Sequence, residues 1–266
     1  MQALEKATGL ELELDSARIT RLPDEAFYIT DFITEDEEER LLRKIPTAPL
    51  PTWKTLSHRR VQTYPSALSP SNALLASPLP PWLSNPIIPR FQSLRLFSDS
   101  PHKEPNHVLV NEYRPGQGIM PHEDGAAYYP LVATVSLGGV VVLDLYPKER
   151  QHEHDDKGEG NNVQKGDADG NGSSNTRRQP KYRILQEQRS LLVTRGSIYG
   201  DYLHGIAEIE RDEDLNAESI CNWDLLGARE RFGDGYNIRE TRVSLTYRDV
   251  LKVSKVGGVM KFLNKK

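Results

Sequence analysis

The feature that most constrains the fold is a series of short segments, rich in β-branched residues, that begins near residue 106 and is punctuated by glycine, proline and polar turns. Many short strands with turn residues between them, and few helices, are typical of a β-sandwich or jelly roll. We therefore predict a mainly β protein with flanking helices, of the α+β type. The expected strands are His107–Tyr113, Val132–Leu137, Val140–Tyr146, Tyr182–Gln186, Ser190–Val193, Ser197–Gly200 and Arg242–Tyr247, with Gly138-Gly139 joining the second to the third.

The residues before these strands predict a helix and an irregular cover. Thr34 followed by Glu37 forms a capping box at the start of a helix, and leucines and an isoleucine up to residue 45 supply its apolar face. Residues 46–105 contain twelve prolines, which exclude long regular elements and leave short strands such as Arg60–Tyr64. We expect one domain over residues 1–266, in which an N-terminal segment (1–45) and this cover precede a core (106–250).

Two polar stretches interrupt the predicted core. Residues 148–180 consist almost entirely of small, charged and amide side chains, so we predict a disordered excursion between two strands of one sheet. Residues 208–240 form the second polar stretch, which either changes the mouth of a site or loops away from it.

Composition excludes several classes of protein. The only cysteine, Cys221, rules out an intramolecular disulfide framework and indicates a reducing compartment, the cytoplasm and nucleus. No apolar run is long enough to span a bilayer, and the N-terminus does not look like a signal peptide. We expect neither a secreted, a membrane-spanning nor a zinc-ribbon protein, and we expect a monomer.

The net charge of −4 conceals an uneven distribution. Residues 1–40 carry four basic and twelve acidic side chains, whereas residues 41–100 carry seven basic side chains, one acidic side chain and five aromatic rings. Basic groups interleaved with aromatic rings suit phosphate neutralisation and base stacking, and so favour nucleic acid. A solvated surface with ordinary core aromatics would give the same pattern.

A candidate metal site begins at His122 and Asp124, which point the same way in an extended chain and can share one ion. The His-x-Asp spacing is not specific by itself, because His154-Asp155-Asp156 repeats it and His102-Lys103-Glu104 is its glutamate version. His204 is the only histidine after the insertion, and can be either a third ligand or a hydrogen-bonded core histidine. Two histidines and one carboxylate would leave positions on Fe(II) open for a co-substrate and dioxygen.

The segment Arg242-Val243-Ser244-Leu245-Thr246-Tyr247-Arg248 alternates polar and apolar residues. In a strand, Arg242, Ser244, Thr246 and Arg248 would share one face, and two buried guanidinium groups would require anions. A dicarboxylate satisfies both groups by bidentate hydrogen bonds, whereas an edge strand would leave solvated arginines. Combined with the metal triad, this face predicts an Fe(II) site that uses 2-oxoglutarate.

The order of these motifs (Asn111-x-Tyr113, His-x-Asp, a distant histidine and Arg-x-Ser-x-Thr-x-Arg) resembles the AlkB branch of the Fe(II)/2-oxoglutarate dioxygenases, over most of residues 25–250. The resemblance implies a double-stranded β-helix (jelly roll) core in which His122, Asp124 and His204 bind iron. It also implies that Asn111, Tyr113 and Arg242 hold the distal carboxylate of 2-oxoglutarate. Arg248, helped by Ser244, would hold the keto-acid end, and Thr246 on the same strand face is a further candidate for co-substrate binding.

The resemblance further implies oxidative demethylation of alkylated nucleic acid, RNA or single-stranded DNA, with loss of an aldehyde. Residues 46–105 would then be a lid over the substrate, as the position of the basic segment suggests. The lid candidates are Trp53, Arg59, Arg60 and Tyr64, each of which can equally be a packing residue of the cover. A protein side-chain hydroxylase or demethylase, and a nucleic-acid-binding protein with little turnover, are the alternatives.

Overall fold

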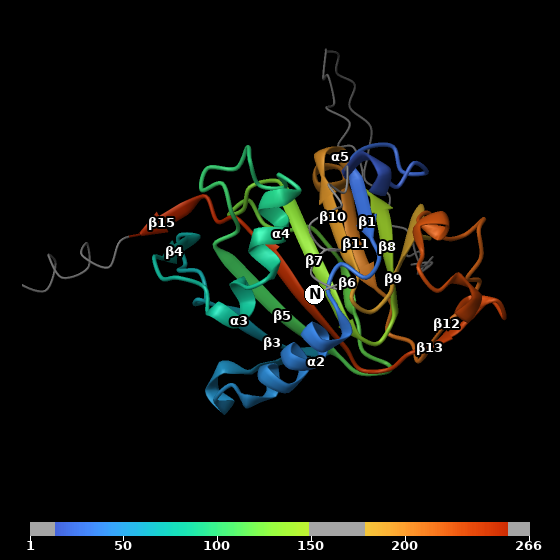
Figure 1. The fold of residues 1–266 in the computed structure, drawn as a ribbon, viewed down its shortest axis with the longest axis horizontal. Coiled ribbons are helices and arrows are strands. Elements are labelled where there is room, and N and C mark those ends of the chain that lie inside the picture. Colours follow the sequence, from blue (N-terminus) through green and yellow to red (C-terminus); the bar gives the residue numbers. More distant parts are fainter. Residues whose placement is uncertain (1–13, 149–178, 255–266) are drawn as a thin grey trace, which may run out of the picture.

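Two antiparallel sheets pack against each other in the computed structural model, which describes residues 14–148 and 179–254 (Figure 1). The predicted jelly-roll architecture is confirmed. The insertion at 148–180 lies outside the described residues except at its ends. The first sheet has seven strands in the spatial order β1 (Ala26–Ile29), β10 (Leu191–Arg195), β7 (Leu131–Gly138), β14 (Arg242–Arg248), β5 (His107–Tyr113), β3 (Arg59–Tyr64) and β2 (Lys54–Leu56). The second sheet has four, in the order β6 (Ile119–His122), β11 (Tyr202–Ile206), β8 (Val141–Pro147) and β9 (Tyr182–Gln186).

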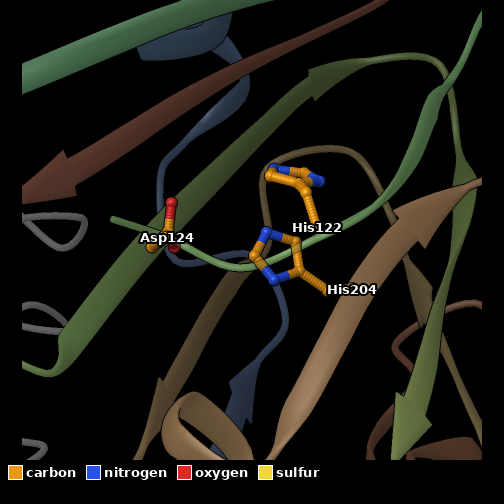
Figure 2. A group of neighbouring side chains, drawn as sticks. All are labelled: His122, Asp124 and His204. Carbon is orange, nitrogen blue, oxygen red and sulfur yellow. The ribbon is translucent and has the colours of Figure 1, made fainter. Parts of the chain in front are cut away.

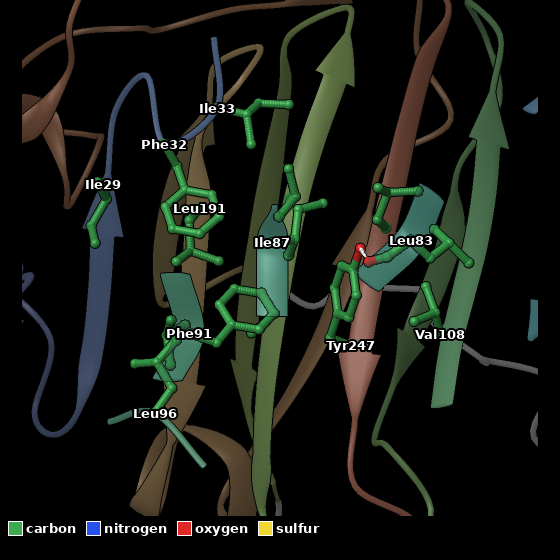
Figure 3. Packing of buried hydrophobic residues seen from close by; sticks show 14 of the residues in the cluster. Ile29, Phe32, Ile33, Leu83, Ile87, Phe91, Leu96, Val108, Leu191 and Tyr247 are labelled. Atoms are coloured by element: carbon green, nitrogen blue, oxygen red, sulfur yellow. Dashed lines mark hydrogen bonds between the residues drawn. The ribbon is translucent and has the colours of Figure 1, made fainter. Parts of the chain in front are cut away.

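Helices cover the outer face of the first sheet. Helices α2 (Glu35–Lys44), α3 (Pro81–Ser84) and α4 (Ile87–Ser93) contribute apolar side chains to one cluster with this face (Figures 1 and 3). Val243, Leu245 and Tyr247 of β14 all lie in that cluster, and the Tyr247 hydroxyl donates to the Leu83 carbonyl at 2.8 Å. Since every second residue of β14 packs outward, the alternate residues must face the other sheet.

Helix α2 begins as the capping box predicts. The Thr34 side chain accepts a hydrogen bond from the Glu37 backbone, and the Glu37 carboxylate accepts one from the Thr34 backbone. Glu38 then ties the helix to the sheet, because its carboxylate accepts from the Gly138 backbone at 2.8 Å and pairs with Arg189 at 3.2 Å.

The sequence suggested that Gly138 and Gly139 form a hairpin turn, but in the structure they do not. β7 and β8 lie in different sheets, so the chain crosses from one sheet to the other at this point. Gly138 has φ +71°, and a Cβ atom at either glycine would lie 2.7 Å from a carbonyl oxygen of residues 240–241. Glycine is therefore required here by close backbone packing and not by a two-residue turn.

Two other strand assignments differ from the structure. Ser197–Gly200 is not a strand but part of the short helix α5 (Gly196–Gly200), whose Ser197 backbone donates to Asp24 at 2.7 Å. Tyr202–Ile206, which was not predicted as a strand, is β11 and lies at the centre of the second sheet.

The polar stretch 208–240 does not loop away from the molecule. It contains the short pair β12 (Arg211–Asp212) and β13 (Asn237–Ile238), and it buries Leu215, Ile220 and Phe232 in a cluster with the second sheet. It also covers the edge of that sheet: the Cys221 backbone donates to the Arg183 carbonyl at 2.8 Å. Covering an exposed edge protects it from pairing with other chains.

The proline-rich cover is built from short pieces, as predicted. The β2–β3 hairpin extends the first sheet beside β5, and β4 (Ala73–Leu75) pairs in parallel with β15 (Lys252–Ser254). Of the helices in the described ranges, none is long and apolar enough to cross a membrane.

Candidate active site

The inner face of the first sheet and the facing strands of the second sheet enclose a cavity. Strand β14 lies between β7 and β5, so the alternative of an edge strand with solvated arginines is wrong. Its alternate polar residues point into the cavity as the strand pattern predicts. The lining includes Asn111, Tyr113, His122, Asp124, Gln186, His204, Arg242, Ser244, Thr246 and Arg248.

Two of the predicted metal ligands are direct cross-strand partners. His122 ends β6 and lies opposite His204 of β11, and the centroids of their rings are 4.4 Å apart. Asp124 follows two residues beyond His122, and Figure 2 shows it beside the two rings. One ligand atom from each of the three residues lies within 4.8 Å of the others, which is close enough for all three to hold one ion.

Both imidazoles are in the chemical state that a metal ligand requires. The Nδ1 atom of His122 donates to the Met120 carbonyl at 2.9 Å, which leaves Nε2 with its lone pair. Burial lowers the pKa of His122 and lowers the pKa of His204 to about 4, so both rings are neutral near pH 7.

Arg248 and Asp124 form a buried ion pair at one end of the cavity. The guanidinium also lies over the ring of Tyr128, 4.9 Å from its centroid. Its Nε atom is buried without a hydrogen-bond partner in the described part of the chain. This arginine therefore has donor capacity that the protein alone does not use.

Arg242, at the other end, has no carboxylate partner among residues 14–148 and 179–254. Its side chain is 3% exposed and donates from one nitrogen to two neutral oxygens, Ser136 Oγ at 2.9 Å and Gln186 Oε1 at 3.1 Å. Burial lowers its pKa to about 10, so it keeps its charge at pH 7. Its Nε atom is buried and unpartnered. A buried charge of this kind requires an anion.

The neighbouring strand brings the two remaining predicted co-substrate residues to Arg242. Asn111 and Tyr113 of β5 lie opposite Ser244 and Arg242 of β14. Arg59 donates from Nε to the Asn111 side-chain oxygen at 3.3 Å and also lines the cavity.

The other three lid candidates do not line the cavity. Arg60 makes a bidentate ion pair with Glu112, at 2.7 and 2.6 Å, and stacks 4.1 Å from the ring centroid of Trp53. The Tyr64 hydroxyl donates to Gln62 at 2.9 Å. Trp53, Arg60 and Tyr64 thus pack within the cover, whereas Arg59 reaches the cavity; contact of these four residues with a substrate stays a prediction.

Sequence reasoning missed three polar residues of this region. Gln186 is a polar residue at the end of a buried strand, and that contrast could have indicated it. Ser136 is a polar position within apolar β7. Tyr199 lines the cavity from helix α5, a segment that was predicted from the sequence as a strand. Its hydroxyl is buried and has no hydrogen-bond partner in the described structure. Burial, with the nearby Asp124 carboxylate, raises its pKa to about 12.

Of the other His-x-acid sequences, the structure describes only the one at His102, and it does not contribute to this site. His102 pairs with Asp249, with 2.6 Å between Nδ1 and Oδ1, and it does not line the cavity. His154 and its neighbours lie outside the described residues.

Comparison with known proteins finds a matching family model and proteins of similar sequence. The model of the 2OG-Fe(II) oxygenase superfamily matches residues 33–248. The "Probable RNA/DNA demethylase ALKBH6" of Danio rerio is 37% identical, over 91% of this chain and 92% of that protein. The "tRNA (carboxymethyluridine(34)-5-O)-methyltransferase alkbh8" of Xenopus tropicalis is 28% identical over 86% of this chain, but only 32% of that longer protein. A solved structure, OsALKBH1, covers 86% of this chain and 99% of its own, with 16% identity and a TM-score of 0.49.

Proposed function

Because the chain belongs to the 2OG-Fe(II) oxygenase superfamily and is an AlkB-like member of it, we propose that it removes alkyl groups oxidatively from RNA or single-stranded DNA. The observation that carries the proposal is the combination, in one cavity, of three metal-ligand side chains with a buried arginine that has no anionic partner among the described residues.

The cavity fits ferrous iron and 2-oxoglutarate. His122, Asp124 and His204 offer two neutral imidazoles and a carboxylate, the ligand set of non-haem Fe(II) oxygenases. The uncompensated charge of Arg242 fits a distal carboxylate, with Asn111 and Tyr113 beside it. The spare Nε donor of Arg248, with Ser244 on the same strand face, fits the keto-acid end.

Bound iron and 2-oxoglutarate, with dioxygen, supply an oxidant that hydroxylates a C–H bond as 2-oxoglutarate becomes succinate and carbon dioxide. The protein contributes position: its metal ligands come from the second sheet, and its arginines from the first. On an N-methyl base, the hydroxylated methyl group would leave as formaldehyde, with the proton returned to the nitrogen.

Two observations support nucleic acid as the substrate. The relatives carry names that refer to RNA, DNA and tRNA. In addition, Arg59 extends from the basic cover to the cavity wall, where its charge can meet a phosphate or a base. A nucleic-acid substrate also agrees with the cytoplasmic and nuclear location expected from the single cysteine, which stays a prediction.

The test is a screen of 2-oxoglutarate turnover by the iron-loaded protein. Succinate and formaldehyde are measured with methylated RNA, methylated single-stranded DNA, their unmethylated counterparts and methylated peptides. We expect methylated oligonucleotides alone to raise succinate above the uncoupled background, with one formaldehyde released for each additional succinate.

Each alternative has its own outcome. Stimulation by peptides alone would replace the proposal with a protein hydroxylase or demethylase. Tight oligonucleotide binding without succinate above background would indicate a binding protein with little turnover.

A further inference from the structure

The charge of Arg242 is held in place without being neutralised. Both hydrogen-bond acceptors on its Nη2 atom, Ser136 Oγ and Gln186 Oε1, are uncharged. Ser136 Oγ also donates to Gln186 Oε1 at 3.3 Å, so the three side chains form one small network. Neutral acceptors orient a guanidinium, but they leave its full charge available to a ligand.

Gln186 reaches this network from the opposite sheet. It is the last residue of β9 and pairs with Val141 of β8, whereas Ser136 and Arg242 lie on β7 and β14. Its side chain is 2% exposed and lines the cavity. The carboxamide is therefore part of the cavity wall. It joins the two sheets at the Arg242 end of β14, away from Arg248.

One half of the Gln186 carboxamide remains unused. Its Oε1 atom receives both hydrogen bonds of the network, and within the described residues its Nε2 atom makes none. Nε2 belongs to a side chain that lines the cavity, and it is not completely buried, so it is in contact with the cavity space. Next to the Arg242 guanidinium, this space offers two kinds of N–H donor to one anion.

We infer that Gln186 is a positioning residue for the dicarboxylate co-substrate. Its Oε1 atom fixes the Arg242 guanidinium, and its Nε2 atom is a second donor to the distal carboxylate. The inference rests on 2-oxoglutarate as the co-substrate in the proposed function, and it does not depend on which macromolecule is oxidised. Glutamine is required because glutamate, nearly identical in shape, would pair with Arg242 and repel the carboxylate.

The decisive variant is Gln186→Glu, compared with Gln186→Leu and with Gln188→Glu as a matched control. Gln188 lies two residues away and does not line the cavity. Calorimetry of the full chain loaded with Mn(II), which supports no turnover, measures the affinity for 2-oxoglutarate. The same titration with 2-oxobutyrate, which has the keto-acid end but no distal carboxylate, reports the rest of the site.

We expect Gln186→Leu to weaken 2-oxoglutarate binding by about tenfold, because hydrogen bonds to charged groups are lost. We expect Gln186→Glu to weaken it by at least 100-fold, because the new carboxylate also pairs with Arg242 and repels the ligand. Affinity for 2-oxobutyrate should change by less than twofold in both variants. The ligand-free Gln186→Glu protein should melt at a higher temperature than the wild type, because it gains a buried ion pair. Gln188→Glu should bind both ligands as the wild type does.

Three outcomes would overturn the inference. They are wild-type affinity of Gln186→Glu for 2-oxoglutarate, an equal loss for both ligands, and no binding of 2-oxoglutarate by the wild type. Failure of every oligonucleotide to stimulate turnover would refute the proposed substrate, but it would leave the ratio of the two affinities, and hence this test, unaffected.

Discussion

At the scale of single residues, the metal-ligand candidates differ in what else they do. Asp124 also neutralises the buried Arg248, so removing its charge would leave an unpaired guanidinium. Within the described part of the chain, the His122 side chain makes one local hydrogen bond, to the Met120 carbonyl two residues earlier. The function of His122 can therefore be tested with little effect on the fold.

We predict that His122→Ala loses iron binding while its melting temperature without metal stays within a few degrees of the wild type. Metal analysis after anaerobic loading, together with thermal unfolding, provides the measurement. His58→Ala is the control, because His58 is an exposed histidine that pairs with Glu208 and does not line the cavity. Full iron occupancy in His122→Ala would remove this residue from the ligand set.

At the scale of elements, one amide side chain adds to the backbone contact of Cys221 in covering the edge of the second sheet. Asn222 is 1% exposed, and its side chain accepts from the Leu185 N–H at 2.9 Å and donates to the Leu185 carbonyl at 2.8 Å. It thus replaces a missing neighbouring strand for β9, the strand that carries Gln186.

We predict that Asn222→Ala lowers the free energy of unfolding by about 2–4 kcal/mol, because it leaves both backbone groups of Leu185 buried and unpaired. Urea denaturation measures this change, and hydrogen exchange of the Leu185 amide should accelerate. Asn216→Ala, which removes an exposed asparagine that caps a nearby turn, should cost clearly less. Equal costs for both variants would contradict the edge-protection role.

The sequence predicts those elements whose evidence is local. The alternation over residues 242–248 specifies which side chains enter the cavity, because period two is a property of the strand itself. The crossing at Gly138-Gly139 was not predictable, because glycine is required there by close contact with carbonyl groups about a hundred residues later in the chain. The position of Gln186 at the end of a buried strand marks it as unusual, but its contact with Arg242 could not be predicted, because that partner lies in the other sheet.

At the scale of the whole molecule, the buried His107 and the half-buried His204 make stability depend on pH. Burial lowers the pKa of His204 and of His107 to about 4, from 6.5. Between these values the unfolded chain binds protons that the folded chain excludes, so stability is fully present above pH 6.5 and falls as the pH decreases toward 4.

We predict that the metal-free protein loses up to roughly 1.4 kcal/mol per pH unit for each of these histidines below about pH 6. Urea denaturation at several pH values measures the slope. His107→Phe should reduce it, because His107 is 2% exposed and neither ring nitrogen has a partner in the described chain. An unchanged slope in His107→Phe would show that this ring does not titrate on unfolding.

The assignment of successive strands to different sheets has a consequence for the choice of co-substrate. His122 and His204 are carried by the second sheet, and Arg242 by the first, so the distance between the metal-ligand side chains and the anion site depends on the spacing of the two sheets. The spacing of the two sheets therefore selects the length of diacid that can reach from the metal-ligand side chains to Arg242. Substitutions between the layers, none touching the ligand, would then reset which chain length the enzyme accepts.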